Sequence, residues 1–426
     1  MNLRSSIRLV PSAIAATAVS AIALLAVAPL TASAVGIANP VCPQSRANVG
    51  IPIVQANALD PDDHAVHVTV QTGSLPAGVT LDGLARVTPY TFSGTPTTAG
   101  TSNFVIKAQF EDAPAVTVSC TMTVGNLPTP SRIAGADRYD QAVEVSAAFE
   151  VAETVYVASG EKFSDALTAG SVAGVHGAPL LLTQAGALPT VTAARLAELA
   201  PTNVVVVGGP ASIAEGVVDA IEGNVPGVSV TRIGGADRYK VSQNLVSDAV
   251  FGVPSTTWSY VADGRNFPDA LAATPPAASL NAPVLLVDGG RTDISPDSLA
   301  ILDGQGVTSI RIAGGPASVS EGVKASLSDR FAVARVSGLT RYDGAVAINQ
   351  AFAEAETAYL ASGEVFPDAL SAGPVAGESN SPIYLVQKSC VPVGVLDDLV
   401  RVKAKKIVIL GGLNTVAAEV GALKPC

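Results

Sequence analysis

An arginine followed by a tyrosine recurs three times in this chain, at intervals of 100 and 103 residues. The pentapeptide GADRY stands at 135–139 and at 235–239, and GLTRY stands at 338–342. A guanidinium group can bind a phosphate or a carboxylate through two parallel hydrogen bonds, and a tyrosine ring can stack on a sugar ring. The arginines could contact an anionic ligand or form an ion pair that joins two loops of one unit, whereas the tyrosines are expected mainly to pack. The candidate residues are Arg138, Arg238, Arg341, Tyr139, Tyr239 and Tyr342.

A second motif, F-x-D-A-L, places an aspartate after a strand, a glycine turn and a phenylalanine, just before a helix. An aspartate there can accept backbone N–H groups of the first helical turn and complement the helix dipole, while the phenylalanine packs into the core. The alternative is that the carboxylate orients the repeated arginine at a groove or binds hydroxyl groups of a ligand. The three aspartates are Asp165, Asp269 and Asp368.

A third motif has two glycines after a strand and a serine or threonine shortly afterwards, so its backbone could approach a phosphate group. It stands at 208–212, 314–318 and 411–415. These segments match neither the G-x-G-x-x-G pattern nor the GK[ST] ending of nucleotide-binding loops, so no nucleotide cofactor is expected. Ser212, Ser318 and Thr415 are expected to be helix N-caps.

Residues that could catalyse a reaction are few. The chain has three histidines, His64, His67 and His176, and it lacks the G-x-S-x-G, H-E-x-x-H and Cys/His patterns. The acidic segment at 60–64 is interpreted as a turn rather than as a calcium site. No catalytic residue, metal ion or cofactor is therefore expected.

The elements that carry these motifs follow an α/β pattern from residue 129 to the end. Short apolar runs alternate with stretches of helical periodicity, which predicts parallel sheets with crossover helices. The motifs G-x-x-R-Y, F-x-D-A-L, an A-P-L-L strand and the strand before the two glycines recur in the same order. The chain therefore contains three tandem repeats: repeat 1 (129–228), repeat 2 (229–332) and repeat 3 (333–426). In parallel sheets ligand sites lie outside the carboxyl ends of the strands, where these motifs stand.

These ordered motifs resemble the cell-wall-binding repeats of the second type, which occur in threes in surface proteins of Gram-positive bacteria. The resemblance covers the chain from Thr129 on. It implies three Rossmann-like units that pack as a pseudo-threefold trimer within one chain, and noncovalent attachment to an anionic wall polymer. The Pro-Leu-Leu strand edges are expected to meet at the threefold centre. The candidate interface residues are Leu181, Leu182, Leu285, Leu286, Tyr384 and Leu385.

Residues 35–125 are expected to form a separate, small β-sandwich. Apolar and polar residues alternate in HAVHVTV and SNFVIKAQF, with Gly, Pro and Thr between these runs. The segments LPAGVTL (75–81) and FSGTPTTAGTSNFVIKA (92–108) resemble the Ig-like, cadherin-like modules of bacterial surface proteins.

The N-terminus has the pattern of a secretory signal. Arg4 and Arg8 precede an apolar run, and Ala32-Ser33-Ala34 fits a cleavage site, so residues 1–34 are expected to be removed. An uncleaved membrane anchor is the alternative. No later apolar run is long enough to span a bilayer, so no membrane span is expected after cleavage.

Export to an oxidising compartment permits disulfide bonds. The chain has four cysteines, and three pairings are formally possible. We expect Cys42 to pair with Cys120 and Cys390 with Cys426, because each pair closes a loop inside one domain.

The net charge of −11 argues against a general nucleic-acid-binding protein, because neutralising phosphates requires a basic surface. The sequence favours a noncatalytic secreted protein at the wall of a Gram-positive-type bacterium, with an anionic wall polymer as its partner. Other surface proteins are further candidate partners. A secreted wall hydrolase with carboxylates at the strand ends and a surface-layer scaffold remain as alternatives. Three near-copies of one site favour avidity, because catalysis needs different residues in different roles.

Overall fold

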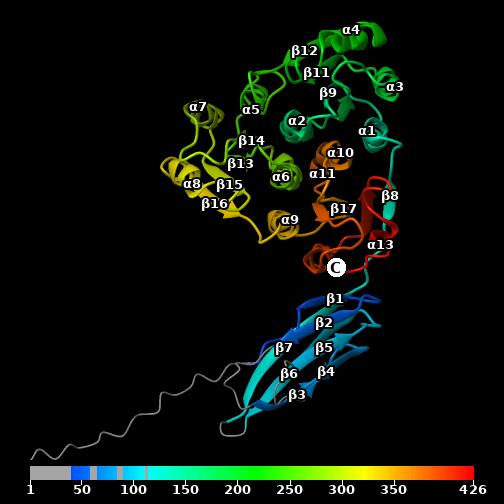
Figure 1. Cartoon of the computed structure of the whole chain (residues 1–426), viewed down its shortest axis with the longest axis vertical. Coiled ribbons are helices and arrows are strands. Elements are labelled where there is room, and N and C mark those ends of the chain that lie inside the picture. Colours follow the sequence, from blue (N-terminus) through cyan, green and yellow to red (C-terminus); the bar gives the residue numbers. More distant parts are fainter. Residues whose placement is uncertain (1–39, 58–64, 84–89, 111–113) are drawn as a thin grey trace, which may run out of the picture. The chain divides into compact units, whose positions relative to one another are not determined.

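The computed structural model describes residues 40–57, 65–83, 90–110 and 114–426 (Figure 1). The signal sequence expected at 1–34 and the acidic turn at 60–64 lie outside these residues. Over the described ranges, no helix combines the length and the apolar character that a membrane crossing needs.

The N-terminal module is a β-sandwich, drawn in blue to cyan in Figure 1. Its described residues form two sheets, in which all pairs are antiparallel except β1 with β7. Phe92, Ile106 and Met122 are fully buried in its core, and a disulfide bond joins Cys42 to Cys120. The first sheet has the order β1 (Arg46–Asn48), β7 (Val116–Gly125), β6 (Gly100–Phe110) and β3 (Ala65–Gly73). The second has the order β2 (Ile53–Asn57), β5 (Tyr90–Gly94) and β4 (Val79–Asp82).

The described residues from 131 to 426 form three α/β units, each with a four-stranded parallel sheet, as the alternating pattern predicts. The first sheet has the order β10 (Leu180–Thr183), β9 (Thr154–Ser159), β11 (Asn203–Val207) and β12 (Ser229–Ile233). The second has the order β14 (Val284–Val287), β13 (Trp258–Asp263), β15 (Ser309–Ala313) and β16 (Ala332–Val336). The third has the order β18 (Ile383–Val386), β17 (Thr357–Ser362), β19 (Lys406–Leu410) and β8 (Ser131–Ile133).

The helices occupy equivalent positions along the three repeats. The G-x-x-R-Y motifs open α1 (Arg138–Ser146), α5 (Arg238–Val246) and α9 (Arg341–Asn349). The F-x-D-A-L motifs open α2 (Phe163–Val175), α6 (Pro268–Ala278) and the pair α10 (Pro367–Leu370) and α11 (Ala372–Glu378). The Pro-Leu-Leu strands lead to α3 (Thr190–Leu199), α7 (Pro296–Gln305) and α12 (Val393–Arg401). The paired glycines precede α4 (Glu215–Asn224), α8 (Glu321–Ser328) and α13 (Ala418–Gly421).

The fourth strand of each sheet comes from the repeat that follows it around the ring. β12 opens repeat 2 but pairs with β11 of repeat 1, and β16 opens repeat 3 but pairs with β15 of repeat 2. β8 opens repeat 1 and pairs with β19 near the end of the chain, so that Arg132 stands opposite Ile409. The three units therefore close into a ring, and the spatial units are offset from the sequence repeats by one strand.

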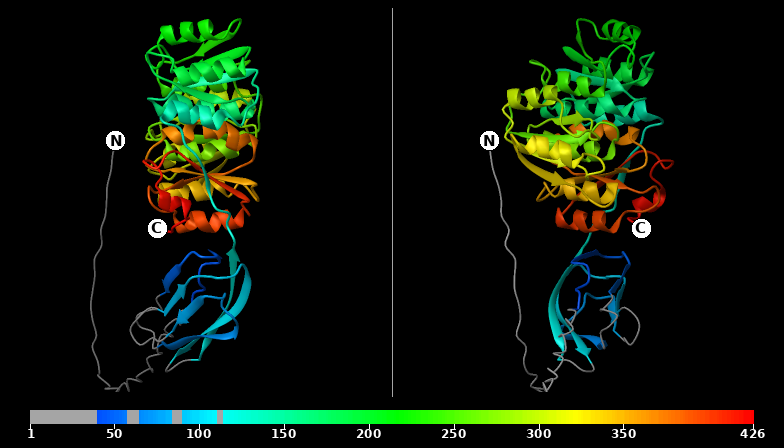
Figure 2. Two further views of the ribbon diagram at one scale, coloured as in Figure 1. Left: turned by 90° about the vertical axis from the view of Figure 1, so that its right-hand side faces the viewer. Right: turned by 60° about the vertical axis from the view of Figure 1, so that its left-hand side comes forward.

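Helices α2, α6, α10 and α11 form the centre of this ring (Figure 1), and the views of Figure 2 show the three units as one block around them. Small residues stand where the helices meet. A Cβ atom added to Gly174 of α2 would lie 2.7 Å from Cβ of Ala278 in α6, and one added to Gly377 of α11 would overlap the same alanine. Glycine here permits a close approach of helix backbones.

Three phenylalanines contact one another at the start of the central helices. The ring centroids of Phe163 and Phe267 are 6.1 Å apart, those of Phe163 and Phe366 are 5.5 Å apart, and those of Phe267 and Phe366 are 5.9 Å apart. The rings are steeply inclined to one another, a favourable arrangement for aromatic pairs. The phenylalanines of the F-x-D-A-L motifs thus mark the pseudo-threefold axis.

The Pro-Leu-Leu strands do not form this centre, contrary to the expectation from their repeated edges. Leu181 and Tyr384 lie in the outer cores of repeats 1 and 3, with residues of α3 and α12. The other expected interface residues belong to the large core to which all three repeats contribute: Leu182, Leu285, Leu286 and Leu385. A direct contact between repeats does reach β14, where the backbone N–H of Val284 donates to Oγ of Ser171 in α2 at 3.0 Å.

Candidate functional site

The arginine and the tyrosine of each G-x-x-R-Y motif contact one glycine of their own repeat. In repeat 1, Arg138 Nη1 donates a 2.5 Å hydrogen bond to the carbonyl of Gly160, just after β9. The ring of Tyr139 lies so close to Gly160 that a Cβ atom there would be 2.8 Å from a ring carbon. The predicted intra-repeat link therefore exists, but its acceptor is a backbone carbonyl rather than a carboxylate. The equivalent hydrogen bonds join Arg238 to Gly264 at 2.6 Å and Arg341 to Gly363 at 2.5 Å, where Tyr239 and Tyr342 pack in the same way.

The aspartate of each F-x-D-A-L motif contacts the paired-glycine motif of its own repeat. Thr415 Oγ1 donates a 2.7 Å hydrogen bond to Oδ2 of Asp368, and Gly411, at φ 102°, lies against the same carboxylate. Any side chain at this glycine would overlap the carboxylate, in addition to the unfavourable positive φ. The equivalent groups are Asp165 with Ser212 and Gly208, and Asp269 with Ser318 and Gly314.

The sequence predicted that Ser212, Ser318 and Thr415 are helix N-caps, and this prediction is wrong. The helices after them begin three residues later, behind the cap residues Ala214, Ser320 and Ala417. The hydroxyl groups are instead turned toward the aspartates. Two motifs that stand about 45 residues apart in each repeat thus form one polar cluster.

Each aspartate is desolvated, and its pKa is lowered by the charge of an arginine from another repeat. Burial raises the pKa of Asp165, whereas hydrogen bonds from Ser212 and Ser164 and the charges of Lys162 and Arg238 lower it. The arginine that acts on Asp269 is Arg341. The arginine that acts on Asp368 is Arg138, so the pattern runs around the whole ring. Each boundary between repeats thus combines an aspartate of one repeat with an arginine of the next.

The boundary between repeats 2 and 3 is hollowed. A cavity of about 240 Å³ is lined there by Asp269 and Ser318 of repeat 2 and by Leu339, Thr340 and Arg341 of repeat 3. Arg341 and Leu339 are exposed, and Leu339 has its full side-chain surface in solvent. Two of the predicted site residues, Asp269 and Arg341, therefore line one concave surface.

A second set of arginines was missed in the sequence analysis. Arg232 of β12 donates from Nη1 to the carbonyl of Gly208 at 2.9 Å, which fixes the first glycine of the pair beside Asp165. Arg132 and Arg335 make the equivalent hydrogen bonds to Gly411 and Gly314, at 2.6 and 2.8 Å. The sequence does contain a pattern that identifies them, because each of these arginines stands six positions before the arginine of a G-x-x-R-Y motif.

Each boundary between repeats offers hydrogen-bonding groups that can bind a ligand. The three motif arginines, Arg138, Arg238 and Arg341, each donate one hydrogen bond to a glycine carbonyl, and no other acceptor among the described residues contacts them. Their remaining N–H groups can bind an anionic group, and the neighbouring carboxylate can accept hydroxyl donors. Among the described residues, no group of three or more His, Cys, Asp or Glu side chains is placed to hold a metal ion.

Two known families match the chain. Cell wall binding domain 2 (CWB2) matches residues 132–218, 232–324 and 335–421, which together exceed half of the chain. The family described as Putative Ig domain matches residues 34–125.

Two relatives from Bacillus subtilis (strain 168) each match more than two thirds of this chain. N-acetylmuramoyl-L-alanine amidase LytC is 26% identical over 291 residues, which are 68% of this chain and 56% of the amidase. Amidase enhancer is 30% identical over 302 residues, which are 70% of this chain and 40% of that protein. This chain thus spans about half the length of these relatives.

Two solved structures share the fold. Cwp6 from Clostridium difficile aligns with a TM-score of 0.63 and 20% identity, over 89% of this chain and 67% of that one. Cwp8 from Clostridium difficile aligns with a TM-score of 0.61 and 23% identity, over 76% of this chain and 58% of that one. With three matched repeats that share their motifs, this chain belongs to the Cell wall binding domain 2 family.

Proposed function

We propose that the chain attaches noncovalently and without catalysis to the bacterial cell wall, by binding an acidic wall polymer at the boundaries between its repeats. We call these sites the inter-repeat grooves, each defined by an aspartate and its neighbouring arginine: Asp165 with Arg238, Asp269 with Arg341, and Asp368 with Arg138. The observation that carries the proposal is that all three boundaries present this same pair, with unused guanidinium donors.

The local charge of the grooves supports an acidic ligand. The chain as a whole carries a charge of −11, so an acidic polymer must be met by cationic groups that are fixed in place. Arg238 is fixed by its hydrogen bond to Gly264 and by its position 5.7 Å from the centroid of the Phe163 ring. A side chain that is ordered before binding loses little conformational entropy when the ligand arrives.

The threefold repetition of the grooves supports a polymeric ligand. A chain of repeating acidic units can occupy several grooves of one protein, and each further contact is then intramolecular. Weak single contacts can in this way give firm attachment. The names of the relatives, an amidase and an amidase enhancer, agree with a role at the wall, and this chain itself carries three matches to Cell wall binding domain 2.

Sedimentation with purified cell walls tests the proposal. We expect the full chain to sediment with walls and to stay in solution when the acidic polymer has been extracted. The triple variant Arg138→Ala, Arg238→Ala, Arg341→Ala should lose at least about tenfold in wall affinity, because hydrogen bonds to charged groups are lost at each groove. Arg330→Ala is the matched control, since Arg330 is an exposed arginine paired with Asp303 in repeat 2.

The other outcomes separate the alternatives. Retention on extracted walls would favour a scaffold that binds protein. Release of labelled wall fragments by the wild type, lost in Asp165→Asn, would favour a hydrolase. A triple variant that still binds walls with wild-type affinity would overturn the assignment of the arginines, and a large fall in its melting temperature would assign them a structural role.

A further inference from the structure

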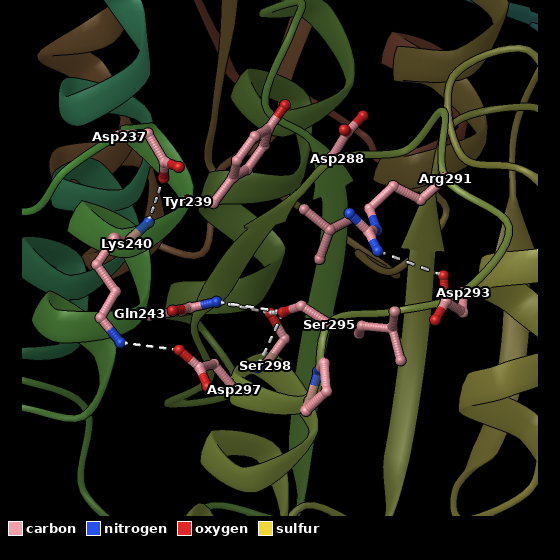
Figure 3. A pocket seen from close by; sticks show the side chains of 13 residues that line it. Asp237, Tyr239, Lys240, Gln243, Asp288, Arg291, Asp293, Ser295, Asp297 and Ser298 are labelled. Carbon is pink, nitrogen blue, oxygen red and sulfur yellow. Dashed lines mark hydrogen bonds and ion pairs between the residues drawn. The ribbon is translucent and has the colours of Figure 1, made fainter.

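A second polar cavity is lined by residues of repeat 2 alone, and two of them, Asp237 and Tyr239, flank Arg238 of an inter-repeat groove. It has a volume of about 360 Å³ and is formed by the first turns of α5, the connection after β14 and the start of α7 (Figure 3). This volume is in the range of small-molecule sites. We call it the repeat-2 cavity, and its polar lining residues are Asp237, Lys240, Gln243, Asp288, Arg291 and Asp297, among others.

The repeat-2 cavity depends on residues that repeats 1 and 3 do not have. Lys240 and Gln243 in α5 correspond to Asp140 and Val143 in α1, and α9 likewise has an aspartate and a valine there. The connection that leads to α7 runs from 288 to 295 and is two residues longer than its counterparts, 184–189 and 387–392. Arg291 and Asp293 belong to this longer connection. The repeat-2 cavity is thus a specialisation of one repeat within a threefold scaffold.

The inner wall of the cavity is ordered and offers an unused acceptor. Gln243 and Ser298 are nearly fully buried, and Gln243 Nε2 donates to Ser298 Oγ at 3.0 Å. Ser295 caps α7 through the backbone N–H of Ser298 and also lies 2.9 Å from Ser298 Oγ. The side-chain oxygen of Gln243 receives no hydrogen bond from any described residue, although Gln243 lines the cavity. This oxygen is accessible rather than buried, so it can accept a hydrogen bond from a molecule in the cavity.

The charges around the cavity disfavour an acidic ligand. Lys240 Nζ is paired with Asp297 at 3.0 Å, and Arg291 lies 3.6 Å from Asp293 (Figure 3). Both cationic groups of the lining are therefore matched. Asp237 accepts from the backbone N–H of Lys240 at 2.8 Å, and Asp288 accepts from the backbone N–H of Gly290 at 3.2 Å and lies 3.8 Å from Arg265, but each carboxylate keeps further lone pairs. The excess of acceptors favours a ligand that brings hydroxyl or ammonium donors.

We propose that the repeat-2 cavity binds a sugar unit without acidic groups, either a hexosamine or a neutral hexose, through its hydroxyl or amino donors. This inference rests on the proposed function only in that a wall glycan would supply the sugar. The source is either the peptidoglycan strand or an uncharged unit of the acidic polymer, and the chemistry of recognition is the same for both. Gln243 accepts from the sugar at the inner wall, and Asp237 and Asp288 accept at the rim.

Titration of the full chain with single sugars, followed by NMR or calorimetry, tests the inference independently of wall attachment. We expect glucosamine or N-acetylglucosamine to bind, and glucuronic acid to bind at least about tenfold more weakly. Gln243→Val introduces the residue that repeats 1 and 3 carry, so the fold tolerates it at this position. It should weaken sugar binding about tenfold, whereas Arg330→Ala should leave it unchanged.

The overturning results are specific. The inference fails if glucosamine, N-acetylglucosamine and glucose all fail to bind the wild type, if glucuronic acid binds best, or if Gln243→Val leaves the affinity unchanged. The source of the sugar is identified by measuring the binding of Gln243→Val to peptidoglycan freed of polymer and, separately, to released polymer. The ligand whose affinity falls below that of the wild type supplies the sugar. If both affinities equal those of the wild type, the cavity takes no wall sugar. If these titrations show no sugar binding, the proposal for the inter-repeat grooves still stands. If the triple arginine variant binds walls like the wild type, the proposal for the repeat-2 cavity still stands.

Discussion

Asp165 of repeat 1 and Arg238 of repeat 2 act on each other across a boundary between repeats. The positive charge of Arg238 opposes the rise in the Asp165 pKa that burial causes. The arginine is fixed to Gly264 of its own repeat, and the aspartate is hydrogen-bonded to Ser212 of its own repeat. Each candidate groove therefore needs two packed repeats, and a single repeat in isolation would contain no complete groove.

The first prediction concerns pH. Burial raises the pKa of Asp165, Asp269 and Asp368 in the folded chain above their usual value of 3.8. Between the unfolded and the raised folded pKa, the folded chain binds more protons, so the contribution of these groups to the free energy of unfolding falls as pH rises. Urea unfolding from pH 4 upward should show this negative slope, and Asp165→Asn should make it shallower. Asp329→Asn, at an exposed position, is the control; a slope unchanged by Asp165→Asn would contradict the prediction.

The second prediction concerns the central helices. Gly377→Ala places a Cβ atom against Ala278, so the helices of repeats 2 and 3 must move apart. We expect the free energy of unfolding to fall by about 1–3 kcal/mol, the usual effect of overpacking a core. Gly304→Ala in α7 has open space around the new methyl group and should raise stability by about 0.5–1 kcal/mol. Thermal unfolding of both variants checks the difference, and equal effects would argue against close central packing.

The third prediction concerns a buried ion pair of repeat 3. Asp398, which is 4% exposed, accepts from Arg401 and also from Tyr384 at 2.7 Å. Arg401→Met leaves this carboxylate without its partner, so we expect a loss of about 3–5 kcal/mol in unfolding free energy. Arg330→Met removes an exposed pair and should change stability by less than about 1 kcal/mol. Denaturant titration distinguishes the two, and a loss as small as that of Arg330→Met would show that Asp398 is hydrated.

The fourth prediction concerns the C-terminal disulfide. Cys390 and Cys426 are bonded and are separated by 36 positions, so the bond limits the freedom of the unfolded chain. Replacing both cysteines by serine should lower the unfolding free energy by about 3–4 kcal/mol. Calorimetry of the oxidised wild type and the double variant measures this effect. An unchanged transition for the repeats would mean that the C-terminal segment contributes nothing to their cooperative unfolding.

The alternation of strands and helices was predictable because it depends on local periodicity. The order of motifs predicted three α/β repeats, and the disulfide pairing followed from loops within single domains; both are found in the structure. The expectation for Ser212 failed for a physical reason. Ser212 lies in a turn, in which its backbone N–H donates to the carbonyl of Gly209, and the helix starts only at Glu215. Its hydroxyl group bonds to Asp165, which stands 47 positions earlier in the chain.

The sequence by itself determined which residues recur and in which elements they stand, because helix and strand signals span only a few residues. Only the tertiary structure decided which recurring residues meet. Arg132 donates to the carbonyl of Gly411, 279 positions away, because β8 completes the sheet of repeat 3 and closes the ring. The charge of Arg238 acts on Asp165 because β12, which opens repeat 2, completes the sheet of repeat 1. Such contacts follow from how whole units pack around α2, α6 and α11, and no local pattern contains that information.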